Sequence, residues 1–132
     1  MPLLYLDSSA LVKVVVGEPE TGALLTLLTR WPERVSSVLA RLEVLRALGR
    51  VRADAAARRR ASAVLARIAL VRIDDAVIDS AARLPPPHLR SLDAIHLATA
   101  LSLGDDLGAL ATYDARLAGA AHAARVRVLT PR

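Results

Sequence analysis

Strand-like and helix-like segments alternate along this 132-residue chain, and that alternation limits the folds open to it. Short apolar runs bounded by turn residues are typical of strands, and segments with apolar residues three and four apart are typical of helices. We expect strands at 3–7, 35–38, 70–74, 108–112 and 126–130, and helices at 8–16, 19–30, 38–49, 54–69, 75–84, 92–103 and 114–121. Such alternation predicts a parallel sheet flanked by helices.

Local signals mark several helix ends. Ser37 and Ser91 stand where an N-cap would stand for the helices that follow them. The step from Trp31 to Pro32 ends the second helix, and the three prolines at 85–87 end the fifth. The chain has no internal repeat and no linker, so we expect a single domain over residues 1–132.

The composition is that of a globular protein with an aliphatic core. Hydrophobic residues make up 54% of the chain, and Phe is absent. The absence of Cys excludes a disulfide scaffold, a zinc–thiolate site and a cysteine nucleophile, and fits a reducing compartment. No signal peptide is evident, and no apolar run nears the roughly 20 residues of a membrane helix. We expect a soluble, cytoplasmic protein without membrane contact.

The chain is basic, with a formal net charge of +5. Nearly all the positive charge is Arg, and Lys13 is the only Lys. Arginine suits bidentate contacts to phosphate and carboxylate groups. The excess therefore fits binding to nucleic acid or to an acidic partner, although a merely solvated surface explains it equally well.

Four acidic residues are placed to meet at one edge of the expected sheet. Asp7 ends the first strand, and Asp114 closely follows the fourth. Asp93 lies in the first turn of its helix, and Glu43 lies on the helix after the second strand. Ligands of open parallel sheets bind at the carboxyl ends of the strands, so these carboxylates predict a site there.

Four neighbouring carboxylates repel one another, and a divalent cation removes that conflict. Oxygen ligands without Cys or paired His favour Mg²⁺, or Mn²⁺, over zinc. We therefore predict Asp7, Glu43, Asp93 and Asp114 as metal ligands and catalytic residues. Such a site can align a phosphodiester and activate a water molecule.

Each of these residues also has an ordinary structural interpretation. Asp7 and Asp114 could be helix caps, Asp93 could favour its helix dipole, and Glu43 could be a surface residue. Ser9 and Thr112, two residues from Asp7 and Asp114, could orient a carboxylate or a water, or serve only in turns. His96 lies on an apolar helix, where a packing role is the more common one.

The motifs together resemble the PIN-domain family. They are YLDSSALVK at the start, Glu43 within LARLEVLRAL, then LDAIHLATA and ATYDARL. The chain looks most like the VapC-type toxins of bacterial and archaeal toxin–antitoxin systems, over essentially its whole length. The resemblance implies a three-layer α/β/α domain with a central parallel sheet of about four or five strands.

The same resemblance implies a magnesium-dependent endoribonuclease. It places the family's acids at Asp7, Glu43, Asp93 and Asp114, and the accompanying hydroxyls at Ser9 and Thr112. It also implies an RNA substrate, a homodimer and a small antitoxin that neutralises the toxin.

Alternatives remain open at this point. They are a PIN-type nuclease in RNA processing outside a toxin–antitoxin pair, and a non-catalytic basic binding module. The Arg-rich stretch 50–60 is a candidate surface for RNA or antitoxin, or simply a solvated helix face.

Overall fold

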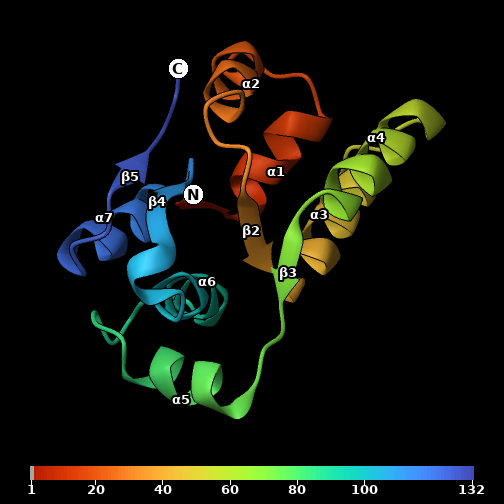
Figure 1. Cartoon of the computed structure of the whole chain (residues 1–132). Helices are drawn as coiled ribbons and strands as arrows, with labels where there is room; N and C mark the ends of the chain where they lie inside the picture. The colour runs from red at the N-terminus through yellow and green to blue at the C-terminus, as the bar shows by residue number, and fades with distance from the viewer. Residues whose placement is uncertain (1) are drawn as a thin grey trace.

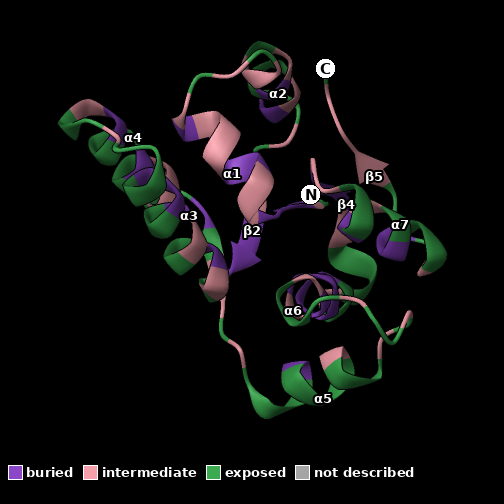
Figure 2. Cartoon of the chain, turned by 180° about the vertical axis from the view of Figure 1, so that it is seen from behind, coloured by how far each residue is buried: buried purple, intermediate pink, exposed green. Residues whose placement is uncertain are grey.

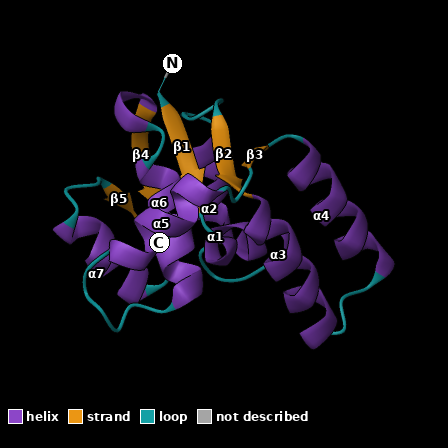
Figure 3. Ribbon diagram, turned by 90° about the horizontal axis from the view of Figure 1, so that it is seen from below, coloured by secondary structure: helices purple, strands orange, loops and turns teal. Residues whose placement is uncertain are grey.

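The computed structural model describes residues 2–132, and over that range it contains one five-stranded parallel sheet. The strand order is β3-β2-β1-β4-β5, with β1 at the centre (Figure 3). The strands are β1 (Leu3–Leu6), β2 (Arg34–Ser37), β3 (Ala69–Val71), β4 (Leu107–Ala111) and β5 (Val128–Leu129). The helices are α1 (Ser8–Val15), α2 (Thr21–Leu28), α3 (Val38–Arg50), α4 (Ala55–Ala66), α5 (Asp75–Arg83), α6 (Ser91–Leu101) and α7 (Ala115–Ala123), with a short 3₁₀ turn at Gly104–Asp106.

Helices cover both faces of the sheet, which gives the expected three layers (Figure 1). Successive strand residues point to opposite faces. Leu4 and Leu6 of β1 therefore enter one core with helices α1 to α4, whereas Tyr5 enters the other core with α6 and α7. Helix α5 packs on the outside of α6, so α6 is largely buried while α4 and α5 stay largely exposed (Figure 2). Across residues 2–132 every helix is too short or too polar to span a bilayer.

All the expected strands and helices are present, but some are shorter than predicted. The helix expected at 19–30 is confined to Thr21–Leu28. The strands expected at 70–74 and 126–130 shrink to Ala69–Val71 and Val128–Leu129. These two strands are the sheet edges, each paired on one side only, so few backbone hydrogen bonds extend them.

The prediction that Ser91 caps α6 is wrong. Arg90 is the N-cap residue, Ser91 is already helical, and no side chain caps this end. A turn closed by Leu89 N–H donating to the Pro86 carbonyl (2.9 Å) precedes it and leaves Arg90 as the extended residue. Ser37 does cap α3 as predicted, accepting a hydrogen bond from Leu39 N at 3.1 Å.

Candidate active site

The candidate site lies where the strand order reverses. The chain passes from β1 to β2 and β3 on one side, and to β4 and β5 on the other. Doubly wound sheets bind ligands at this switch point, beyond the carboxyl ends of the strands. Asp7 directly follows β1 and Thr112 directly follows β4, and the Thr112 hydroxyl donates to Asp7 Oδ2 at 2.5 Å. The fold thus joins two predicted site residues that are 105 positions apart.

Asp7 is the N-cap of α1 and is also a buried acid, because the residue is only 3% exposed. Its Oδ1 accepts hydrogen bonds from Ala10 N (2.9 Å), which caps α1, and from Ser9 Oγ (2.6 Å). Burial raises the pKa of this carboxyl, although the bonds from Ser9 and Thr112 oppose the rise. A carboxylate offers about four acceptor positions, so one on Oδ2 stays open to a ligand.

Ser9 and Thr112 also fix the segment that carries Asp114. Ser9 Oγ accepts from Tyr113 N at 2.9 Å, and Thr112 Oγ1 accepts from Asp114 N at 3.0 Å. Asp114 is the N-cap of α7, where its Oδ1 accepts from Arg116 N at 2.8 Å. The two hydroxyls therefore link the start of α1 to the turn after β4.

Asp93 lies in the first turn of α6, as predicted. Its Oδ2 is the buried side-chain polar atom that, within residues 2–132, has no hydrogen-bond partner. Burial raises the pKa of this carboxyl, and the charges of Asp114 and Asp7 raise it further. A buried oxygen without a partner is costly, so this position is suited to an external ligand.

Glu43 has hydrogen-bond partners of its own. The Ser8 hydroxyl donates to Glu43 Oε1 at 2.5 Å, and His96 Nε2 lies 2.7 Å from the same oxygen. Burial raises the pKa of Glu43, but the hydrogen bonds from His96 and Ser8 outweigh it and hold the pKa below its usual value. Glu43 is therefore an ionised, oriented carboxylate.

His96 connects Glu43 to the core. Its side chain is buried, and the Tyr5 hydroxyl lies 2.7 Å from Nδ1. Burial raises the pKa of Tyr5 above its usual range, so the hydroxyl stays protonated and can donate to Nδ1. When Nδ1 accepts from Tyr5, the Nε2–H of His96 is directed at Glu43 and can donate to it.

Sequence reasoning missed Ser8 altogether and assigned His96 to packing. His96 is indeed buried, but it also orients a predicted site residue. The available signal was its position one turn beyond Asp93, on a helix that is otherwise apolar.

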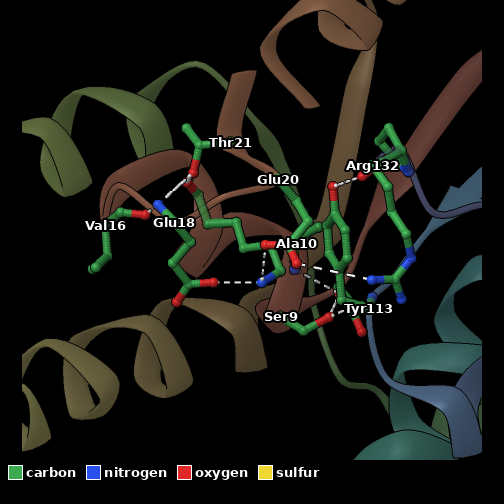
Figure 4. A network of polar contacts seen from close by, with 11 residues as sticks. Ser9, Ala10, Val16, Glu18, Glu20, Thr21, Tyr113 and Arg132 are labelled. Carbon is green, nitrogen blue, oxygen red and sulfur yellow. Dashed lines mark hydrogen bonds and ion pairs between the residues drawn. The ribbon is translucent and has the colours of Figure 1, made fainter. Parts of the chain in front are cut away.

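An ionic network lies beside Ser9 (Figure 4). Lys13, Glu18 and Tyr113 of this network line one hollow together with Ser9 and Glu43. Lys13 pairs with Glu18 and with Glu20 (3.2 Å), and its ammonium lies 4.7 Å from the centre of the Tyr113 ring. The Tyr113 hydroxyl donates to the Pro131 carbonyl at 2.8 Å. The only Lys of the chain is thus neutralised beside the site, and the C-terminal residues are held against it.

The structure brings Asp7 and Asp114 close enough to Asp93 for their charges to act on it, and Glu43 lines a hollow together with Ser9, which bonds Asp7. Within the described chain, no three His, Asp or Glu side chains already stand in position to hold a metal ion. A site without three preassembled protein ligands is compatible with Mg²⁺, because this ion commonly keeps several waters and binds one or two carboxylates plus substrate phosphate. The unpartnered Asp93 oxygen and the all-oxygen donor set fit such a cation.

The chain is similar to known proteins over nearly its full length. The PIN domain family matches residues 4–123. Ribonuclease VapC46 of Mycobacterium tuberculosis is 50% identical over 131 residues, covering 99% of both chains. Ribonuclease VapC35 of the same species is 41% identical and covers 98% of this chain and 97% of its own.

Two solved structures have the same fold. The M. tuberculosis VapC20 toxin, described as cleaving the sarcin–ricin loop, superposes with a TM-score of 0.73 at 18% identity, over 89% of this chain and 94% of its own. A toxin–antitoxin complex from Klebsiella pneumoniae gives 0.71 at 23% identity, over 100% of this chain and 98% of its own. The sequence and fold similarities agree, and the chain belongs to the PIN domain family, among its VapC-type members.

Proposed function

We propose that this protein is a magnesium-dependent endoribonuclease and the toxin of a type II toxin–antitoxin pair. The observation that carries the proposal is the buried Asp93 Oδ2, which lacks a protein partner and lies near the charges of Asp114 and Asp7. A cation supplies that partner and favours the ionised carboxylates. The relatives named Ribonuclease VapC support RNA cleavage, and the similar toxin–antitoxin complex supports an antitoxin partner.

The side chains of the site have different roles in the proposed reaction. Asp93, Asp7 and Asp114 would hold Mg²⁺, with Mn²⁺ as the alternative. When bound, the cation supplies the positive charge that activates water and stabilises the leaving oxygen. Glu43, held ionised by His96 and Ser8, orients the attacking water and accepts its proton. Ser9 and Thr112 keep the Asp7 carboxylate facing the site.

The test is RNA cleavage by the purified protein with Mg²⁺, with Mn²⁺ and with EDTA. Glu43→Gln and Asp93→Asn should each abolish cleavage and leave the circular dichroism spectrum unchanged. Glu33→Gln, on an exposed residue before β2, is the matched control and should cleave like the wild type. Equal cleavage by all four proteins would show that the site is wrongly assigned.

The toxin role needs a separate test in cells. Controlled expression should arrest growth, and sequencing of RNA ends should reveal new cuts that Glu43→Gln does not produce. Co-expression of a neighbouring small DNA-binding protein should restore growth. Cleavage without such a neutralising partner would favour a nuclease of RNA processing instead, and RNA binding without cleavage would favour a non-catalytic module.

We also propose that the protein acts in the cytoplasm as a homodimer. An exposed apolar stripe on α3, formed by Val38, Leu42 and Leu45, offers a surface that a second copy could cover. Light scattering after size exclusion should give twice the monomer mass, and Leu42→Arg should shift it toward the monomer. An unchanged mass for this variant would place the interface elsewhere.

A further inference from the structure

A hollow of about 540 Å³ adjoins the candidate site, between the loop before α6 and one side of α7. Figure 1 shows this loop on the same side of the molecule as α7. Pro86, Leu89 and small residues of α7 give it apolar walls, and His88, Arg90 and Arg116 add planar cationic or polar groups. Its volume lies within the roughly 300–1,000 Å³ typical of ligand pockets.

Two arginines that line the hollow are near neighbours of the acids in the chain. Arg90 is the N-cap of α6, one turn before Asp93, and Arg116 donates its backbone N–H to Asp114 at 2.8 Å. Within the described residues, neither guanidinium forms an ion pair or a hydrogen bond, so both are free for an anion. Lys13, beside Ser9 and Glu43, is instead held by two carboxylates.

These walls match an unpaired nucleotide better than other anions. Single-stranded RNA is recognised by splayed bases that stack on aromatic, His or Arg planes, while Arg binds the phosphates. An acidic peptide would use the arginines but would not need an apolar hollow between them. Double-helical RNA presents no free base to enter it.

We propose that this hollow receives one unpaired nucleoside next to the cleaved phosphate, with Arg90 and Arg116 binding adjoining phosphates. The inference rests on the proposed ribonuclease function for the class of its ligand. It adds a position for one base beside the cleaved phosphate, lined by Pro86, Leu89 and one side of α7.

The first arm of the test measures the phosphate contacts. Fluorescence anisotropy of labelled oligouridine is recorded with EDTA over a range of salt concentrations. Each lost contact to single-stranded RNA lowers the slope of log K against log salt by about 0.7, so Arg90→Ala with Arg116→Ala should lower it by about 1.4. The pair Arg58→Ala with Arg59→Ala, exposed on α4 within the Arg-rich stretch, is the matched control and should leave the slope unchanged.

The second arm fills the hollow. Gly119 lines it, and a Cβ built at Gly119 meets no atom within 4 Å, so the side chain of Gly119→Leu starts in open space and adds bulk to the hollow. Leucine also has the higher helix propensity, so the melting temperature should not fall. Oligouridine should bind about 5-fold more weakly or worse, with an unchanged salt slope, while binding of a blunt RNA duplex should not change. Gly22→Leu on α2, equally open, is the control and should bind like the wild type.

The outcomes separate this inference from the proposed function. Wild-type cleavage with unaltered binding by the Arg90/Arg116 and Gly119 variants would overturn the hollow and leave the nuclease standing. A slope change in the Arg58/Arg59 pair instead would place the RNA on α4. The expected binding changes without any cleavage would support the hollow and overturn the nuclease. A lowered slope for the Arg90/Arg116 variant with no effect of Gly119→Leu would show that the arginines bind RNA phosphates while no nucleoside enters the hollow, and would overturn the nucleoside pocket.

Discussion

Replacing Asp93 with Asn should stabilise the metal-free protein. The wild-type carboxylate has a buried oxygen without a partner and lies near the charges of Asp114 and Asp7. Asn keeps the shape and removes the charge, and its amide can donate to a neighbouring carboxylate. The variant therefore relieves a cost that the wild type bears whenever no cation is bound.

The size of the effect follows from the burial of the group. A buried, unsatisfied polar group costs about 1–3 kcal/mol, and the half-buried position of Asp93 places it near the lower end. About 1 kcal/mol corresponds to a rise in Tm of about 3–5 °C for a domain of this size. Magnesium at ten times its Kd would stabilise the wild type by about 1.4 kcal/mol, so its addition should reverse the order of the two proteins.

The assay is thermal unfolding near neutral pH, with EDTA and with Mg²⁺. Asp79→Asn, on an exposed residue of α5, is the matched control and should stay within about 0.5 kcal/mol of the wild type in both buffers. A lower stability of Asp93→Asn than of the wild type in EDTA would refute the cost assigned to the unpartnered carboxylate. Equal stabilisation of both proteins by Mg²⁺ would refute Asp93 as a metal ligand.

The same variant has a defined pH dependence. The folded-state pKa of Asp93 is raised above its ordinary value of 3.8, so the folded protein binds this proton more tightly than the unfolded chain. Its stability contribution is complete below pH 3.8 and is lost as the pH rises through the raised pKa. The advantage of Asp93→Asn should therefore be absent in acid and fully developed above that pKa.

Three further variants test other parts of the structure. His96→Leu removes the partner of the Tyr5 hydroxyl and one of the two hydrogen-bond partners of Glu43, which keeps Ser8, and should cost about 2 kcal/mol in urea unfolding. The loss of the hydrogen bond from His96 should also raise the pKa of Glu43 and move the acid limb of the pH–rate profile to higher pH. An acid limb at the wild-type pH would contradict the role of His96 in holding Glu43 ionised. Gly108→Ala brings a Cβ to 2.5 Å from the Trp31 ring and should cost about 1–3 kcal/mol by the same measure. Lys13→Met removes two partly exposed ion pairs and should cost about 1 kcal/mol or less, a loss that high salt should abolish.

The order of elements was predictable because each depends on local pattern. The apolar run before Asp7 indicates a strand, and the Ala-rich segment before Arg67 indicates a helix, without any tertiary information. The ends were less predictable, because they depend on contacts across the fold. Asp74, which closes the expected third strand, instead caps α5 by accepting from Val77 N at 2.9 Å, so the strand stops at Val71.

The site was predictable only where it follows from topology. Asp7 and Thr112 both follow central parallel strands, so a parallel sheet alone brings them together. The partners of His96 are different: Tyr5 lies 91 residues away in sequence, Ser8 lies 88 and Glu43 lies 53. No spacing in the sequence links them, because they meet only when α6, α3 and the start of α1 have packed.

The two half-buried acids of the cleft differ in a way that supports separate roles. Burial disfavours charge on both, yet Glu43 receives hydrogen bonds from His96 and Ser8 and has a lowered pKa. Asp93 receives none on its buried oxygen, faces two further acids and has a raised pKa. When neighbouring groups have their pKa values driven apart, their chemical roles tend to differ as well. Glu43 is already ionised and positioned, which suits proton transfer from water, whereas Asp93 gains most from a cation. In the proposed mechanism, Glu43 is thus a base that is already positioned before any cation binds, and Asp93 is a ligand whose buried oxygen lacks a partner until one does.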